Sequence, residues 1–368
     1  MYEKELLALK RADRFRQRVV YDKNLKDFAS NDYLGFAEKK SFLKKAYKEL
    51  KRFPSNAAKA SLLVNGYTQI HKNFEEDLCR VNGFENGVVL GSGFLANIAM
   101  IEALPRRGDL LLIDEEYHAS GILATKLSIG KVEFFRHNDA EDLKNKIKRS
   151  SAKRVFIAVE GVYSMSGDLL NEEIFHIADE NEALLIVDEA HSSGVIGQKL
   201  MGIFDYYKIW PKSNHIKMGT LGKAYGSYGA YILASKEIIS FLENRAKSII
   251  YTTALSLFDV LLAHEALKYI KKKSKKLSKR IEERKDIIKS VLNKDIESLI
   301  LPIEFKSSND VLMAQKSLLQ KGFLVGSIRP PTVKQPILRV IPRLKESKKS
   351  FYRLLKEIEL LQKEFRSK

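Results

Sequence analysis

The sequence contains very little cysteine: Cys79 is the only one among its 368 residues. A single cysteine cannot form a disulfide within the chain, which is typical of proteins in a reducing compartment. Long apolar runs are also missing, because the longest uncharged stretch, residues 86–101, is too short to cross a bilayer. The amino-terminal residues are charged from Glu3 onward and lack the apolar core of a signal peptide. We therefore expect a cytoplasmic protein with no membrane partner.

Metal-binding and nucleic-acid-binding patterns are scarce as well. His71, His137 and His191 form no pair with i, i+4 spacing and are joined by no second cysteine, so we expect no metal site. The net charge of +18 could attract nucleic acid, but it is spread along the chain. Its densest cluster, residues 271–280, falls on an expected long helix whose charged face is exposed to solvent. We expect no nucleic-acid partner, although a basic surface favours an acidic substrate or carrier.

Strand and helix patterns alternate through the middle of the chain, which predicts an α/β protein built on a parallel sheet with crossover helices. The expected strands are Gly87–Leu90, Leu110–Ile113, Val132–Phe135, Arg154–Val159, Leu184–Asp188, Ile216–Met218 and Tyr228–Leu233. A long basic helix then leads to a helix at Asn309–Gln320, strands near Phe323 and Ile337, and a last helix with an apolar stripe. An amphipathic helix is expected at about Lys4–Arg18. We expect an N-terminal segment (1–45), a large domain (46–250) and a small domain (251–368).

The stretch from Leu184 to Gly226 carries three chemically useful side chains. The apolar run LLIV ends at Asp188, and His191 follows; in TLGKAYG, Lys223 stands among small residues. Because an open parallel sheet binds ligands at the carboxyl ends of its strands, both segments could face one cavity. Pyridoxal phosphate requires a lysine that holds its aldehyde as a Schiff base and an acidic partner for its pyridinium nitrogen. Lys223 and Asp188 supply these two groups.

The letters DEAH also suggest a nucleic-acid-dependent ATPase. Such an enzyme needs a phosphate-binding loop of the form GxxxxGK[ST] before its strand-end carboxylates. The candidate around Lys223 has Lys217 in place of the first glycine and Ala224 in place of Ser or Thr, and it follows DEAH. The ATPase remains a remote alternative to a pyridoxal phosphate enzyme.

Other polar residues follow expected strands. The glycines of GSGFLAN, residues 91–97, allow backbone amides to approach a phosphate at a helix N-terminus. Thr220 could add a hydroxyl to that phosphate or simply stabilise a turn, and His118 could stack on a pyridine ring or cap the next helix. Ser164 could contact the cofactor or a substrate. Arg339, on an expected strand, could bind a carboxylate through two hydrogen bonds.

Ten short motifs occur in the order found in the α-oxoamine synthases, and the chain resembles this family from about Arg11 to Ile341. The motifs are NDYLGF, NGYTQIH, GSGFLAN, DEEYHAS, RHND, EGVYSMSGD, DEAHSSGVIG, TLGKAYG, IYTTAL and IRPPTV. The resemblance implies the fold of a fold-type-I pyridoxal phosphate-dependent transferase, with a mostly parallel central sheet, helices on both faces and a smaller α+β C-terminal domain. It also implies a homodimer with the active site at the subunit interface.

The resemblance further implies roles for individual residues. Lys223 would hold the cofactor, Asp188 would pair with the pyridinium nitrogen, and His118 would stack on the ring; these are the expected catalytic residues. The other residues expected to contact the cofactor are Gly93, Phe94, Ser164, His191 and Thr220. The residues expected to contact substrate are Arg16, Thr332 and Arg339.

Within the family, IRPPTV is most similar to the branch that condenses L-alanine with a pimeloyl thioester in biotin biosynthesis. The resemblance implies a donor carried by coenzyme A or by an acyl carrier protein, with release of carbon dioxide. Two alternatives of the same cofactor class stay open: an aminotransferase, and a sister synthase that uses glycine or serine with another acyl-coenzyme A.

Overall fold

A computed structural model describes residues 1–12 and 14–367, which fold into two compact units. The smaller unit comprises Met1–Tyr33, Met165–Gly167 and Arg280–Lys368, and the larger comprises Leu34–Ser164 and Asp168–Lys279. The division into segments 1–45, 46–250 and 251–368 stays a prediction. Within residues 1–12 and 14–367, no helix is both long and apolar enough to cross a membrane.

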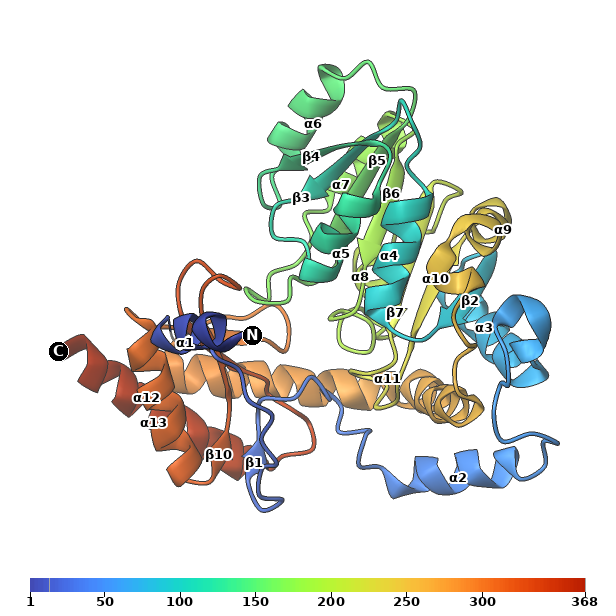
Figure 1. Ribbon diagram of the computed structural model, residues 1–368. Helices are drawn as coiled ribbons and strands as arrows, with labels where there is room; N and C mark the ends of the chain where they lie inside the picture. The colour runs from blue at the N-terminus through green and yellow to red at the C-terminus, as the bar shows by residue number, and fades with distance from the viewer. Residues whose placement is uncertain (13, 368) are drawn as a thin grey trace. The chain divides into compact units, whose positions relative to one another are not determined.

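A seven-stranded sheet forms the centre of the larger unit (Figure 1). The strands, in spatial order, are β2 (Asn86–Leu90), β8 (Ala230–Ala234), β7 (His215–Thr220), β6 (Leu184–Asp188), β5 (Val155–Glu160), β3 (Leu110–Asp114) and β4 (Lys131–Phe135). Every strand expected between residues 87 and 233 is present, and the α/β fold class is confirmed. Only β8 runs against its neighbours. It reverses because residues 221–229 are too few for a crossover connection between parallel strands.

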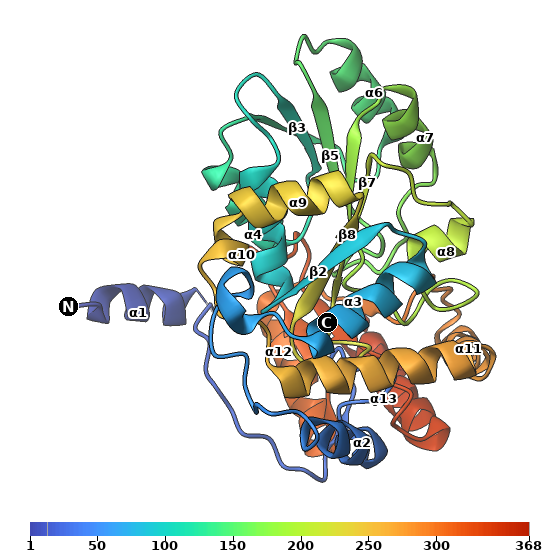
Figure 2. The same cartoon turned by 90° about the vertical axis from the view of Figure 1, so that its right-hand side faces the viewer.

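Helices bury both faces of this sheet. Figure 2 shows α4 (Gly93–Ala103), α9 (Lys236–Arg245) and α10 (Lys247–Ile250) on one side and α6 (Ala140–Lys148), α7 (Glu173–Glu180) and α8 (Ile203–Tyr207) on the other. Leu185, Ile186 and Val187 of β6 are all fully buried although they alternate between the two faces. Burial on both sides explains why the central strands have continuous apolar sequences instead of alternating ones.

The remaining helical segments of the larger unit are α2 (Lys40–Leu50), η1 (Leu62–Gly66), α3 (Gln69–Asn82), α5 (Ala119–Ala124) and η2 (Thr125–Leu127). Ile70, Phe74 and Leu78 of α3 are buried, and Gly83, with φ 81°, ends that helix in the left-handed conformation. The long basic helix is α11 (Leu257–Leu292), whose helical dihedrals are interrupted at Lys273. Its residues up to Lys279 belong to the larger unit and the rest to the smaller.

The smaller unit contains a three-stranded antiparallel sheet of β11 (Gly326–Ile328), β12 (Ile337–Val340) and β9 (Leu301–Glu304). A separate parallel pair joins β1 (Lys26–Asp27) to β10 (Phe323–Leu324). The predicted apolar stripe of α13 (Lys348–Ser367) packs with α12 (Ser308–Gln320) and the sheet in one core. The expected helix at Asn309–Gln320 and the strands at Phe323 and Ile337 are confirmed. The sequence analysis missed β9 and β11.

The N-terminal helix is shorter than predicted. α1 spans Glu3–Arg11, and residues 14–18 are not helical, so the expectation of a helix to Arg18 was wrong. None of the residues of α1 is buried. An amphipathic sequence without a surface to pack against gains little from extending its helix, because short isolated helices are only marginally stable in water.

Within the smaller unit, Arg343 forms hydrogen bonds with residues at and just before the start of the NDYLGF motif. Its Nη1 donates to Asp27 Oδ2 at 2.6 Å, and its Nη2 donates to Asp32 Oδ2 at 2.7 Å. The Arg343 Nε group also donates to the backbone carbonyl of Asp32. A fully buried guanidinium requires such partners, because an unpaired charge in the interior is strongly unfavourable.

Candidate active site

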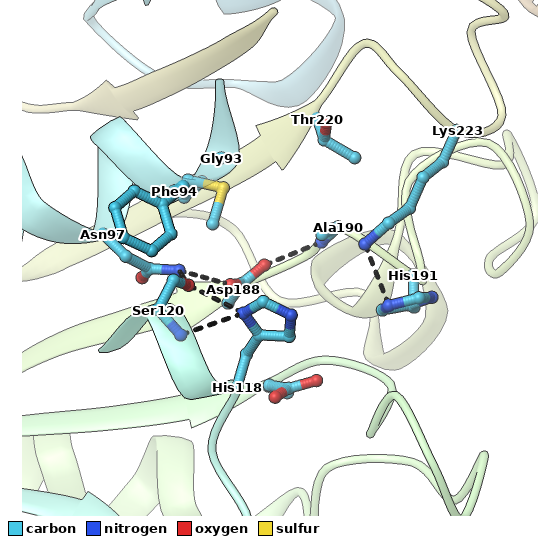
Figure 3. A pocket seen from close by; sticks show the side chains of 12 residues that line it. Gly93, Phe94, Asn97, His118, Ser120, Asp188, Ala190, His191, Thr220 and Lys223 are labelled. Atoms are coloured by element: carbon cyan, nitrogen blue, oxygen red, sulfur yellow. Dashed lines mark hydrogen bonds between the residues drawn. The ribbon is translucent and has the colours of Figure 1, made fainter. Parts of the chain in front are cut away.

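A cavity of about 210 Å³ lies at the carboxyl ends of β5, β6 and β7 in the larger unit (Figure 3). It is lined by Gly93, Phe94, Asn97, His118, Ser120, Glu160, Asp188, Ala190, His191, Met218, Thr220 and Lys223. The strand register places Glu160, Asp188 and Met218 side by side, and the first turn of α4 adds Gly93 and Phe94. The cavity therefore brings together seven residues that the sequence analysis selected: Gly93, Phe94, His118, Asp188, His191, Thr220 and Lys223.

Lys223 lies in the turn between β7 and β8. Gly226 donates its N–H to the Lys223 carbonyl at 3.0 Å. Gly226 has φ +60°, and a Cβ there would lie 2.3 Å from the backbone nitrogen of Ala37, so this turn requires glycine. The turn directs the Lys223 Nζ to within 2.8 Å of Nε2 of His191, as Figure 3 shows.

Asp188 ends β6 and is only 4% exposed. Its Oδ2 accepts a hydrogen bond from Asn97 Nδ2 at 2.9 Å, and its Oδ1 accepts one from the Ala190 N–H at 2.9 Å. The Tyr117 hydroxyl donates to Asn97 Oδ1 at 2.7 Å, which fixes the orientation of the Asn97 amide. Two N–H donors favour a negative charge on this buried carboxyl group.

His118 is the N-cap residue of α5 and also lines the cavity. The Ser120 N–H donates to its Nδ1 at 3.2 Å, so the proton of the neutral ring resides on Nε2. The Ser120 hydroxyl lies 2.7 Å from the same nitrogen and accepts from Asn97 Nδ2. Burial and the positive charge of Lys223 lower the pKa of His118, against the attraction of Asp188. The ring is therefore neutral near pH 7.

Thr220 and Ser164 differ in their relation to the cavity. Thr220 lines it and also stabilises the turn, since its Oγ1 donates to the Gly229 carbonyl at 3.1 Å and accepts the Gly222 N–H at 3.3 Å. Ser164 is buried in the loop after β5 and is not among the residues that line the cavity. The cofactor contacts of both residues stay predictions.

The sequence analysis missed four polar residues of this site: Asn97, Tyr117, Ser120 and Glu160. Asn97 ends the motif GSGFLAN, Tyr117 and Ser120 belong to DEEYHAS, and Glu160 opens EGVYSMSGD. Each could have been noticed as a polar residue within a motif that also carries an expected site residue. Ser120 contacts His118 from two residues away, but Asn97 bonds Asp188, and Tyr117 bonds Asn97, across distant segments that a local pattern does not connect.

The expected substrate residues Arg16, Thr332 and Arg339 belong to the smaller unit. Arg16 is exposed beyond α1, and Thr332 is exposed in a loop, with its N–H donating to the Arg329 carbonyl. Arg339 lies on β12 as predicted; it is buried, and its Nη1 donates to Asn31 Oδ1 at 2.8 Å. Their substrate contacts stay predictions. Among residues 1–12 and 14–367, no cluster of three or more His, Cys, Asp or Glu could hold a metal ion.

Known proteins resemble the chain over nearly its whole length. The sequence profile of the family "Aminotransferase class I and II" matches residues 23–349. The 8-amino-7-oxononanoate synthase of Helicobacter pylori (strain ATCC 700392 / 26695) is 46% identical over 349 residues, 94% of each chain. The enzyme of that name from Saccharophagus degradans is 33% identical, over 92% of this chain and 90% of its own.

Two solved structures have the same fold. The 8-amino-7-oxononanoate synthase of Francisella tularensis superposes with a TM-score of 0.79 at 26% identity, covering 94% of this chain and 99% of its own. The Sphingomonas wittichii serine palmitoyltransferase superposes with a TM-score of 0.89 at 22% identity, covering 100% of this chain and 98% of its own.

The fold and the family match define a pyridoxal phosphate-dependent transferase of fold type I. The chain belongs to the class I and II aminotransferase family, in the group of the 8-amino-7-oxononanoate synthases. The expected family, fold class and cofactor are thereby confirmed. The alternative of a DEAH-type ATPase receives no support from these relatives.

Proposed function

We propose that this enzyme condenses L-alanine with a pimeloyl thioester, releasing carbon dioxide, to form 8-amino-7-oxononanoate in biotin biosynthesis. The observation that carries the proposal is the 46% identity, over 94% of each chain, with the 8-amino-7-oxononanoate synthase of Helicobacter pylori. The acyl donor is carried by coenzyme A or by an acyl carrier protein, and the free thiol carrier is a product. Either carrier is acidic, which suits the net charge of +18.

The cavity fits pyridoxal phosphate in size and in chemistry. At about 210 Å³ it is smaller than pockets for drug-sized ligands and suits a compact, single-ring molecule. It offers the Lys223 amine to an aldehyde and the buried Asp188 carboxylate to a pyridinium nitrogen. The first turn of α4, at Gly93 and Phe94, offers backbone amides and a partial positive charge to a phosphate.

Each cavity residue has a place in this proposal. Lys223 would hold the cofactor through Nζ, Asp188 would pair with the ring nitrogen, His191 would bond the ring oxygen, and His118 would stack on the ring. Gly93, Phe94 and Thr220 would bind the phosphate, and Ser164 would contact the cofactor from the loop after β5. When bound, pyridoxal phosphate supplies a pyridinium ring that withdraws electrons from the Cα of the amino acid.

The protein's own groups then control charge and protons. The negative charge of Asp188 favours a protonated ring nitrogen, and Asn97 and Ala190 keep that carboxylate oriented. The Lys223 amine is the base that removes the Cα proton of alanine, and His191 holds Nζ in place from 2.8 Å. Because His118 is neutral, it brings no second positive charge to the pyridinium.

Three residues of the smaller unit would select the substrates. The Arg339 guanidinium would bind the alanine carboxylate through two parallel hydrogen bonds, a geometry that arginine is suited to provide. Arg16 and Thr332 would also contact substrate. These assignments rest on the family resemblance and on the position of Arg339 on a buried strand, where Asn31 orients it.

The enzyme would act as a homodimer whose active site lies at the subunit interface. Val64 and Tyr251 are 77% and 79% exposed, although both are large apolar side chains. A bridge between Ser61 and Thr253 brings their two segments together. Phe94, which lines the cavity, is also 45% exposed. Exposed apolar side chains, among which Phe94 lines the cavity, support coverage by a second copy, and we place the enzyme in the cytoplasm. Light scattering should give the mass of a dimer for the wild type. The mass measured for Val64→Asp should be lower.

A panel of amino acids and acyl donors tests the reaction. L-alanine with pimeloyl-coenzyme A or the pimeloyl carrier protein should give 8-amino-7-oxononanoate by product mass, with little product from acetyl or succinyl donors. Glycine should react slowly, since one methyl group in an apolar pocket discriminates by only about 1 to 3 kcal/mol. If glycine with acetyl-coenzyme A outcompetes alanine with the pimeloyl donor, the enzyme is a sister synthase instead.

A further inference from the structure

Glu160 and Asp188 are carboxyl side chains on neighbouring strands of the same cavity. β5 and β6 run parallel with Glu160 opposite Asp188. Residues paired in this way lie roughly 5 Å apart and point to the same face of the sheet. Both are buried, with exposures of 2% and 4%, and both line the cavity. The proposed function uses only Asp188, so the role of the second carboxyl group is open.

The two carboxyl groups have unequal hydrogen-bond partners. Asp188 accepts one N–H donor on each oxygen, from Asn97 and Ala190. The backbone N–H of His118 faces Glu160 and opposes the rise of its pKa. The Glu160 Oε1 is buried without a hydrogen-bond partner in the part of the chain that the structure describes. A buried carboxylate oxygen without a donor is far less stable than a protonated one. These partners place the negative charge on Asp188 and a proton on Glu160.

Electrostatic repulsion also favours a proton on Glu160. Two adjacent buried carboxylates repel each other, so ionisation of one opposes ionisation of the other. Burial raises the pKa of Glu160 well above its usual value, and the charges of Asp188 and Asp114 add to the effect. Lys223 and the His118 amide oppose the rise without cancelling it.

We propose that Glu160 is the neutral member of this carboxyl pair and a positioning residue for His118. Its proton leaves Asp188 as the only charged carboxylate of the pair. Its accepting oxygen holds the backbone of His118 at the start of α5, while Ser120 holds the ring through Nδ1. The backbone and the ring of His118 are thus fixed separately, from two different elements.

The charge assignment can be tested on the cofactor-free protein, independently of the proposed function. Difference infrared spectroscopy at pH 7 compares the wild type with Glu160→Gln and Asp188→Asn. The band of a protonated carboxyl group should disappear in Glu160→Gln and persist in Asp188→Asn, which should instead lose an ionised-carboxylate band. If Glu160→Gln loses an ionised-carboxylate band, Glu160 is charged and the proposal is wrong.

The positioning role rests on the proposed function and needs a second measurement, the binding and visible circular dichroism of pyridoxal phosphate. Glutamine keeps an acceptor for the His118 N–H and places an N–H donor near the former hydroxyl, so Glu160→Gln should bind the cofactor within about twofold of the wild type. Asp188→Asn, the matched control, should bind it at least tenfold more weakly. Glu160→Leu lacks the acceptor and should alter the dichroism of bound cofactor.

Two outcomes would overturn the positioning role. In one, Glu160→Gln weakens cofactor binding as much as Asp188→Asn does. In the other, Glu160→Leu gives the same dichroism as Glu160→Gln, which would mean that the acceptor for His118 is unnecessary. If the substrate panel identifies a different acyl donor, both infrared and cofactor-binding results keep their meaning, because neither uses a substrate.

Discussion

The Nζ of Lys223 lies 2.8 Å from Nε2 of His191. The two residues come from different connections: Lys223 from the turn after β7, and His191 from the loop after β6. Their meeting depends on the parallel pairing of β6 and β7, which brings both strand ends to one edge of the sheet. The Lys223 amine therefore faces the cavity that also contains the buried Asp188 carboxylate. The ends of these two strands thus supply the two groups that pyridoxal phosphate requires.

Lys223→Ala should remove the covalent attachment of the cofactor and abolish measurable turnover. Loss of a positioned proton acceptor alone lowers rates by about 10²-fold to 10⁴-fold. Borohydride reduction followed by mass spectrometry should find a cofactor adduct on Lys223 in the wild type and none in the variant. The exposed Lys236, outside the cavity, is the control, and Lys236→Ala should keep the adduct. An adduct on another lysine in Lys223→Ala would remove Lys223 from this role.

Much of the larger unit could be predicted because its strands are apolar runs bounded by glycine and polar residues. The same pattern placed Asp188, His118 and Thr220 at strand ends, where a parallel sheet collects its ligands. Contacts that depend on tertiary packing could not be found in this way. Asn97 reaches Asp188 across 91 positions in the sequence, and its place on α4 gives no local sign of that bond.

The smaller unit was harder to predict for a different reason. β9 and β11 are short, and they contain Pro302 and Gly326, residues that weaken a strand pattern. They form strands because β12 pairs with both of them. α1 shows the opposite error: its sequence is suited to an amphipathic helix, but no packing surface extends that helix beyond Arg11.

Asn97→Ala should weaken cofactor binding and lower stability together. The substitution removes one of the two N–H donors to Asp188 and leaves the Tyr117 hydroxyl without its acceptor. Losing a buried hydrogen-bond partner costs about 1 to 3 kcal/mol. Urea unfolding and cofactor titration should both detect the change. Asn145→Ala, at an exposed position of α6, should leave both values unchanged. Unaltered cofactor affinity in Asn97→Ala would show that Asn97 does not orient Asp188.

Arg343→Ala should destabilise the protein by about 3 to 5 kcal/mol, because removing one member of a buried ion pair is strongly destabilising. Arg343 is 3% exposed, and its loss would leave the Asp32 carboxylate, which is also buried, without its ion-pair partner. Thermal unfolding of the whole chain should show the loss. Lys349→Ala, at an exposed position of α13, serves as the control. A melting temperature close to that of the wild type would show that the ion pairs contribute little.

His137 gives the protein a stability contribution that depends on pH. Its Nδ1 lies 3.1 Å from Asp114 Oδ1 and its Nε2 lies 3.0 Å from Asp168 Oδ2, with Glu116 4.0 Å away. Burial opposes a positive charge there, but the bonds to Asp114 and Asp168 prevail and raise the pKa of His137 to about 10. Tyr163 packs edge-on against the ring and donates its hydroxyl to Asp114.

Because the pKa of His137 in the folded protein exceeds the value of about 6.5 for an unfolded histidine, its contribution is complete below pH 6.5. It is lost as the pH rises through about 10. At pH 6 the free energy of unfolding of the wild type should therefore exceed that of His137→Gln by about 1.5 to 3 kcal/mol. This is the range for hydrogen bonds to charged groups. The difference should shrink steadily towards pH 10. Urea unfolding across this pH range measures it, with His176→Gln at an exposed position as the control. A difference that stays constant with pH would mean that His137 acts without its charge.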